Sequence, residues 1–330
     1  MLDFRQLTAQ LDTFTLDNQR SLRESESGLH EARRRLQIAG EVYEALTQKL
    51  DGKIKTSWLI PRPCEQLSST HTASEIHLVH NVFSSDGSQI IGDRHEIAEC
   101  LLINIGLISL FYGTKKPPQL ESIPRLMQSG NEILTDMGES VEYNARQIAS
   151  ERLLAELVLL ADMCEQEQSE APSVALVDGT LILWSIENES DEYKASCLER
   201  FNATLDRFRD MGIPVAGYIS RPGGKEVVNL LRVAVCPHPS VNCDTYCPNR
   251  HRPKSDAERA NCHGVEGVSD ELLYSDLPVR HRSSLFYSTS SILESSLLTT
   301  KFTIFTFKQE AKSLVWKYPS GWVEIAAFWN

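Results

Sequence analysis

Residues 174–180 read VALVDGT, a short run of aliphatic and β-branched residues that ends in an aspartate, a glycine and a hydroxyl residue. Residues 82–88, VFSSDGS, show the same pattern earlier in the chain. A single Asp-Gly pair between apolar runs is most often a hairpin turn. Because the pattern occurs twice, we interpret each copy as a β-strand that ends by presenting its aspartate, Asp86 or Asp178, at the rim of a sheet. The glycine beside each aspartate leaves room for a ligand or metal to approach the backbone.

Strand and helix patterns alternate around these two runs. Short β-branched or apolar runs predict strands, whereas apolar residues at helical spacing predict helices. We expect strands at 76–83, 174–177 and 213–219, and helices at 139–168, 195–211 and 227–235. The apolar segment 97–112 fits either a buried strand or a buried helix. This alternation predicts an α/β domain with a mixed sheet flanked by helices.

The N-terminal part has a different pattern, with apolar residues every seven positions between residues 17 and 50. This seam consists of Leu22, Leu29, Leu36, Tyr43 and Leu50. It fits a coiled-coil-like helical arm, and it fits equally a helix packed on its own domain. Pro61 and Pro63 interrupt the chain after it. We therefore expect an arm at 1–60 and one larger domain at 61–330.

Composition and charge limit the possible functions. The 330 residues carry a formal net charge of −12, and residues 201–330 are less acidic than residues 1–200. An acidic protein attracts phosphate weakly, so DNA would have to be held by a local basic surface or delivered by a partner. The chain has no apolar run long enough to cross a bilayer and no apolar signal core, so we expect a cytoplasmic protein with no membrane partner. Neither a Walker A motif nor a Gly-x-Ser-x-Gly elbow occurs, which argues against ATPase activity and covalent hydrolysis.

Acidic residues in this pattern favour metal-dependent hydrolysis of a phosphodiester. Two divalent ions about 4 Å apart, held by several carboxylates, can activate water and stabilise the leaving oxygen. Mg²⁺ and Mn²⁺ prefer such oxygen ligands. Beyond Asp86 and Asp178, the helix expected at 139–168 offers Glu156, which stands among apolar residues where a carboxylate is unusual. Glu151, beside Arg152, fits a solvated helix face and is the second choice.

Several motifs occur together in one order. They are Ser85-Asp86-Gly87-Ser88-Gln89, Asn104-Ile105-Gly106, the helix with Arg152 and Glu156, Val177-Asp178-Gly179-Thr180-Leu181, Gly217-Tyr218-Ile219-Ser220-Arg221-Pro222, Asp276-Leu277-Pro278 and Ser284-Leu285-Phe286-Tyr287. Over about residues 76–290 this order resembles the NurA-domain DNA nucleases.

The resemblance implies an RNase H-like fold and a Mn²⁺- or Mg²⁺-dependent nuclease. It further implies trimming of DNA ends from 5′ to 3′, with endonuclease activity as a further option. Members act in DNA repair and end resection with the hexameric ATPase HerA, and a homodimer is expected. By motif, Asp86 and Asp178 would be catalytic metal ligands and Glu156 the carboxylate between them.

The chain departs from the family pattern near its end. The family normally carries a functional histidine on a late helix, whereas the last histidine here is His281. The alternative function is therefore a catalytically impaired scaffold or interaction protein.

Two further groups are candidate binding residues. Cys236, Cys243, Cys247 and Cys262 cluster in the loop-like segment 236–263, together with three histidines. Their spacing lacks the paired Cys-x-x-Cys knuckles of a zinc ribbon, so free thiols and a Zn²⁺ or iron–sulfur centre both remain open.

A second group follows the strand at 213–219. Arg221 and Lys225 lie in a Pro-Gly-Gly loop and fit either a phosphate contact or a solvated loop. His95, soon after the first Asp-Gly-Ser, is a further candidate for lining the site.

Overall fold

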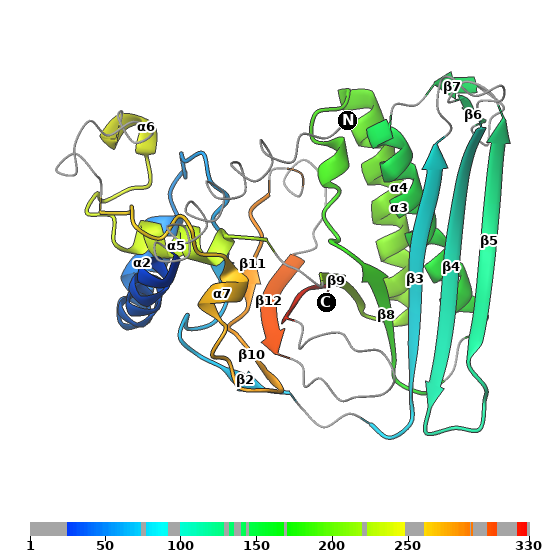
Figure 1. The fold of residues 1–330 in the computed structure, drawn as a ribbon, viewed down its shortest axis with the longest axis horizontal. Helices are drawn as coiled ribbons and strands as arrows, with labels where there is room; N and C mark the ends of the chain where they lie inside the picture. The colour runs from blue at the N-terminus through cyan, green and yellow to red at the C-terminus, as the bar shows by residue number, and fades with distance from the viewer. Residues whose placement is uncertain are drawn as a thin grey trace, which may run out of the picture. The chain divides into compact units, whose positions relative to one another are not determined.

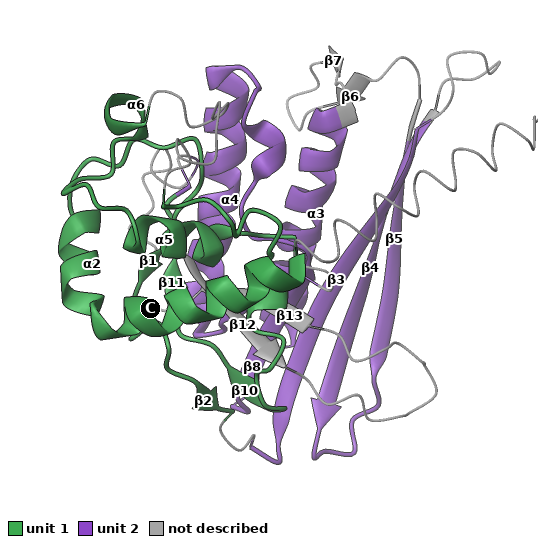
Figure 2. Cartoon of the chain, turned by 60° about the vertical axis from the view of Figure 1, so that its left-hand side comes forward, with its two compact units in different colours: residues 1–73, 221–289, 305–324 green, residues 74–220, 290–304, 325–330 purple. Residues whose placement is uncertain are grey.

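The computed structural model describes most of the chain, in two compact units (Figure 2). The described residues are 25–73, 77–91, 100–128, 132–134, 140–142, 145–167, 170–219, 223–247, 261–290, 292, 302–308 and 322–328. Unit 1 comprises residues 1–73, 221–289 and 305–324, and unit 2 comprises residues 74–220, 290–304 and 325–330.

Unit 2 is built on a mixed five-stranded sheet (Figure 1). Its strands are β3 (His80–Ile91), β4 (Cys100–Tyr112), β5 (Gln119–Gln128), β8 (Ser173–Asp178) and β9 (Val215–Ile219). Their order is β5-β4-β3-β8-β9. The β3–β4 and β4–β5 pairs are antiparallel, whereas β3–β8 and β8–β9 are parallel. The expected mixed sheet is therefore confirmed, and β5 is a strand that the sequence patterns did not predict.

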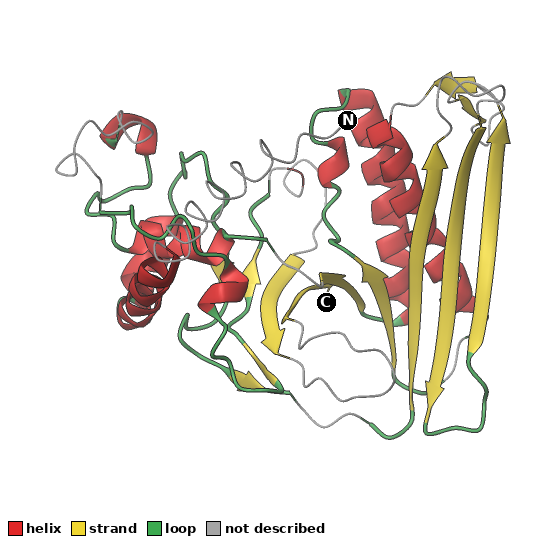
Figure 3. Ribbon diagram, in the orientation of Figure 1, coloured by secondary structure: helices red, strands yellow, loops and turns green. Residues whose placement is uncertain are grey.

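Two long helices cover one face of this sheet (Figure 3). Helix α3 (Ala145–Gln166) precedes β8, and α4 (Asp191–Met211) connects β8 to β9. Helix α4 begins where the Ser190 side chain accepts a hydrogen bond from the Tyr193 N–H, and it ends at Gly212, whose φ of 67° suits glycine. Smaller elements are the 3₁₀ turn η1 (Trp184–Ile186) and the strand pair β6 (Glu132–Leu134) and β7 (Ser140–Glu142).

Alternation along β4 shows why the segment 97–112 is a strand. Leu101, Ile103, Ile105 and Leu107 are all at most 5% exposed and pack with Ile148 of α3. The residues between them lie on the opposite face, which is the period of two expected for a strand. In a helix, residues at every second position would point in different directions around the axis and could not all face α3.

Unit 1 contains the N-terminal helical residues 25–41 and many short elements. These are α2 (Tyr43–Leu50), β1 (Arg62–Pro63), β2 (His71–Thr72), α5 (Glu226–Ala234), α6 (Cys243–Tyr246), α7 (Asp270–Leu273), β10 (His281–Arg282) and β11 (Phe286–Tyr287). The last two strands, β12 (Phe302–Lys308) and β13 (Trp322–Phe328), have residues in both units.

The N-terminal helical residues pack on their own unit. Ala32, Ala39 and Leu46 are at most 3% exposed and share a core with Val228 and Leu231 of α5. Of the two interpretations of the seven-residue pattern, the described residues therefore adopt the helix packed on its own domain. The small alanines in the seam permit this close approach. None of the helices that the structure describes has an apolar stretch capable of crossing a bilayer.

Candidate active site

Asp86 and Asp178 lie on neighbouring parallel strands. The β3–β8 ladder ends at the pair Ser85–Val177, and each aspartate is the next residue along its strand. Ser85 and Val177 are both 2% exposed on the helix side of the sheet. Because side chains alternate, both aspartates lie on the opposite, open face, where each is exposed. Adjacent strands are only about 4.8 Å apart, so the two carboxylates are close neighbours.

The expectation that Asp86 lies at a strand end is wrong. Strand β3 continues to Ile91 and pairs with β4 along its full length, with Asp86 opposite Gly106. The pair Asp86-Gly87 is therefore neither a turn nor a terminus. The neighbouring parallel strand β8 ends beside Asp86, so Asp86 lies at the end of the β3–β8 ladder and not at the end of its own strand.

Asp178, in contrast, closes its strand as expected. Gly179 follows with φ of 98°, a conformation that favours glycine, and its N–H donates to the Tyr218 carbonyl at 2.7 Å. A Cβ on Gly217 would lie 2.5 Å from the Gly179 carbonyl oxygen. Two glycines on adjacent segments thus allow the chain to turn tightly directly after Asp178.

The Glu156 side chain lies on the helix side of the sheet, in the space that a side chain at position 87 would otherwise fill. A Cβ on Gly87 would lie 2.2 Å from Glu156 Oε1 and 3.0 Å from Arg152 Cγ. Arg152 Nη1 donates to Glu156 Oε1 at 3.0 Å and also to the Gly87 carbonyl. Glu156 is only 2% exposed. The missing side chain at Gly87 therefore lets a buried ion pair lie against the back of β3.

Burial raises the pKa of Glu156 to about 7. The Arg152 guanidinium opposes this rise, and the negative charges of Asp86 and Asp178 add to it. Arg152 does not cancel the cost of removing the carboxylate from water. The influence of both aspartates shows that the three carboxylates are near enough to interact electrostatically.

This donor set fits a hard divalent cation. Mn²⁺ and Mg²⁺ favour carboxylate oxygens, and Asp86 and Asp178 present two such groups on the same exposed face of the sheet. Among the described residues, however, no three His, Cys, Asp or Glu side chains gather closely enough to hold one ion. Asp86 and Asp178 are thus the pair that faces a ligand, and Glu156 lies behind them with Arg152.

Glu151 lies on a different side of α3 and takes no part in this cluster. Its carboxylate is paired with Arg200 of α4 at 2.8 Å and accepts a hydrogen bond from Tyr193. The side chain is 13% exposed, so Glu151 joins two helices rather than facing solvent as expected. The choice of Glu156 over Glu151 thus rests on position as well as on the apolar sequence around it.

The remaining candidates lie elsewhere or outside the described residues. Lys225, in unit 1, is exposed and donates to the Glu266 carbonyl at 2.6 Å. Arg221 and His95 lie outside the described residues. Cys236, Cys243, Cys247 and Cys262 are all half-buried in the structure. They do not form a metal-binding group within the described part of the chain, and a Zn²⁺ or iron–sulfur centre stays a prediction.

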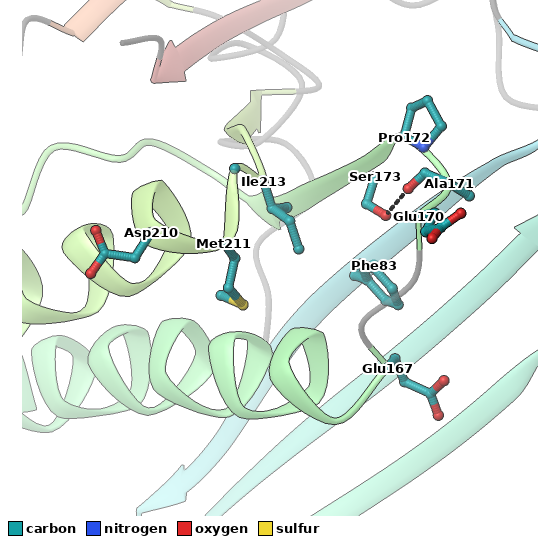
Figure 4. A pocket seen from close by; sticks show the side chains of 10 residues that line it. Phe83, Glu167, Glu170, Ala171, Pro172, Ser173, Asp210, Met211 and Ile213 are labelled. Carbon is teal, nitrogen blue, oxygen red and sulfur yellow. Dashed lines mark hydrogen bonds between the residues drawn. The ribbon is translucent and has the colours of Figure 1, made fainter.

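A cavity of about 630 Å³ in unit 2 lies at the wrong end of the strands for this chemistry (Figure 4). It is lined by Ser173, where β8 begins, and by Ile213, just before β9, whereas Asp178 ends β8. Glu167, Glu170 and Asp210 also line it. Its acidic lining would repel a phosphodiester, and its residues include none of the three candidate carboxylates.

The strand order and directions define the class of protein. Three antiparallel strands are followed in the chain by two parallel ones, with a helix before each of the last two, which is the arrangement of an RNase H-like domain. Residues 80–313 match the family model of the NurA domain, and the chain therefore belongs to the NurA domain family.

Two solved structures are similar to the chain. The NurA nuclease from Sulfolobus solfataricus aligns with a TM-score of 0.39 and 10% identity, over 88% of this chain and 76% of that chain. Endonuclease V from Ciona intestinalis, in complex with a 24mer DNA containing an inosine followed by a ribo-adenosine, aligns with a TM-score of 0.22 and 15% identity, over 44% and 48%. No curated protein sequence matches the chain significantly.

Proposed function

We propose that the chain is a Mn²⁺- or Mg²⁺-dependent deoxyribonuclease that trims DNA ends from 5′ to 3′ during repair. Membership of the NurA domain family supports a nuclease. The observation that carries the proposal is the exposed pair Asp86 and Asp178 at the open end of the β3–β8 ladder, with Glu156 behind Gly87. A HerA-like hexameric ATPase as partner and a homodimeric state belong to the same proposal.

The candidate residues lie on the two faces of β3 and would have different roles on each face. Asp86 and Asp178 would hold a divalent ion on the open face, where a phosphodiester can reach it. Arg152 would keep the buried Glu156 oriented towards Gly87. A bound ion would supply Lewis-acid activation of water and stabilisation of the leaving oxygen. Gly106 opposite Asp86 and Gly179 after Asp178 add no side chain on the open side at this end of the ladder.

Asp86→Asn tests the proposal on linear DNA with Mn²⁺. Cleavage should fall at least about a hundredfold because a ligand matters more than the groups that orient it. Glu156→Gln, which changes a carboxylate behind β3 rather than a ligand on the open face, should lower cleavage by a smaller factor, whereas Glu151→Gln on the same helix should cleave normally. Circular dichroism and thermal unfolding would verify that each variant folds. Unreduced cleavage by Asp86→Asn would reject the assignment.

A non-catalytic scaffold is the second candidate. The close pairing of Glu156 with Arg152 favours it, because that ion pair already occupies one carboxylate oxygen. The two candidates differ in one assay. A folded parent protein that leaves both single- and double-stranded DNA intact across Mn²⁺ and Mg²⁺ concentrations would favour the scaffold.

A further inference from the structure

A shallow groove of about 350 Å³ lies beside Asp86 on the open face of the unit 2 sheet. It extends across three adjacent strands, β3, β4 and β5, and Asp86 itself forms part of its lining. Gly106 faces Asp86 across the β3–β4 ladder, so the groove is not filled by a side chain at that position. The volume lies at the lower end of the range for small-molecule pockets.

The lining of the groove combines polar and apolar side chains. Ser84, Ser88 and Asn104 supply hydroxyl and amide groups. Asn104 Oδ1 accepts a hydrogen bond from Ser122 Oγ at 2.9 Å, which leaves the amide NH₂ as the donor towards a ligand. Ile108 and Leu120 supply apolar surface, and Leu120 is 77% exposed. An exposed leucine beside hydrogen-bonding groups suits a ligand with a flat apolar face and polar edges.

The charge of the lining excludes a phosphate inside the groove. Among the described residues that line it, the ionisable ones are Asp86 and Glu121, both acidic, and none is cationic. A phosphate placed there would be repelled, whereas an uncharged sugar and base would not. The groove therefore fits the nucleoside part of a nucleotide, with the phosphate left at its Asp86 end.

We propose that this groove binds the sugar and base of an unpaired nucleotide next to the phosphodiester at Asp86 and Asp178. This inference rests on the proposed nuclease function and specifies the substrate as a single-stranded end. In a duplex an internal base is stacked on both faces and its polar edge is paired, so Leu120 and Asn104 can contact the face and edge of one base together only when that base is unpaired. Asn104 and the two serines then contact its polar edge and sugar.

Two leucines of β5 provide a matched test. Leu120 and Leu126 are 77% and 72% exposed and lie on the same face of the same strand, but only Leu120 lines the groove. Both are changed to serine in the Asp86→Asn background, which blocks cleavage. Binding of a fluorescent short oligothymidylate is measured by anisotropy in the presence of Mn²⁺. Leu120→Ser should weaken binding about threefold to tenfold through lost apolar contact, and Leu126→Ser should leave it unchanged.

The outcomes separate the groove from the nuclease. Equal affinities of the two serine variants, or no binding of the oligothymidylate by the parent, would overturn the groove. In the active protein, Leu120→Ser should raise KM for single-stranded DNA by a similar factor with little change in kcat. If the parent never cleaves DNA but Leu120→Ser still weakens binding, the nuclease proposal fails and the groove stands. If cleavage occurs and both serine variants match the parent in KM and affinity, the groove proposal fails and the nuclease proposal stands.

Discussion

At the scale of single residues, Gly87 controls how the two faces of β3 are used. Its neighbour Asp86 is exposed on the open face, while the space at Gly87 is taken by Glu156 and Arg152 from α3. A single methyl group at this position would overlap the Glu156 carboxylate. The site thus depends on a missing side chain as much as on the acidic ones.

Gly87→Ala should destabilise the protein by about 1–3 kcal/mol, because overpacking a filled site forces neighbours to shift. It should also lower any nuclease activity by displacing Glu156. Gly52→Ala is the control, since a Cβ there meets nothing within 4 Å. Chemical denaturation would give the free energy of unfolding of each variant.

A double-mutant cycle tests the stated cause. In a Glu156→Ala background the clash is removed, so Gly87→Ala should cost clearly less than in the parent. Equal costs in both backgrounds would show that the strain at Gly87 does not come from Glu156.

Sequence patterns revealed part of this site. The repeated Asp-Gly motif indicated Asp86 and Asp178, and an acidic residue among apolar ones indicated Glu156, which is indeed buried. The sequence could not reveal that β3 continues past Asp86, because that depends on pairing with β4. The role of Gly87 depends on the register of α3 against β3, and no local pattern encodes such a register.

At the scale of elements, α5 depends on a residue distant in the sequence. The residue preceding it, Lys225, provides no side-chain cap. Instead Asp270 of α7 accepts hydrogen bonds from the Val227 and Val228 N–H groups at 3.0 and 2.9 Å. These N–H groups of the first turn have no partner within the helix. Asp270 is 2% exposed, and burial raises its pKa from 3.8 to about 6.

This raised pKa predicts that unit 1 loses stability as the pH rises. The folded state binds the Asp270 proton more tightly than the unfolded state, so this contribution is fully present below pH 3.8 and is lost as the pH passes about 6. The loss should be on the order of 3 kcal/mol. Urea unfolding of the parent and of Asp270→Asn, which cannot ionise, should diverge across this window. Parallel pH profiles would contradict the prediction.

The elements themselves were largely predictable, and the exceptions have physical reasons. Apolar periodicity predicted α5, β8 and β9 to within two residues of their observed bounds, and α3 and α4 to within six. Strand β5 was missed because its sequence, QLESIPRLMQ, does not alternate regularly between apolar and polar residues and contains Pro124. The seven-residue pattern of the N-terminal helix fitted two packings equally, because it fixes the apolar face but not the partner.

At the scale of the whole molecule, the formal net charge of −12 opposes binding to DNA. If few cationic side chains contact phosphates, few counterions are released, and the affinity depends only weakly on salt. The groove beside Asp86 is consistent with this, since none of the described residues in its lining is cationic. Attraction to the backbone would then have to come from a bound divalent ion or from a partner.

For the Asp86→Asn variant with single-stranded DNA, the slope of log affinity against log salt concentration should be shallower than about −3. Fluorescence anisotropy over a range of KCl concentrations would measure it. A steep slope would instead reveal a local basic surface and remove the need for a partner that delivers DNA.

The fit between Gly87 and Glu156 has an evolutionary consequence. A relative can carry a larger residue in place of Gly87 only if its residue at position 156 is shorter than glutamate. A relative that keeps glutamate at position 156 must also keep the glycine. The two positions should therefore change together among relatives, even though they lie far apart in the chain. A relative with a bulky residue at the first position should carry a small one at the second, and with it a different way of supplying the third carboxylate.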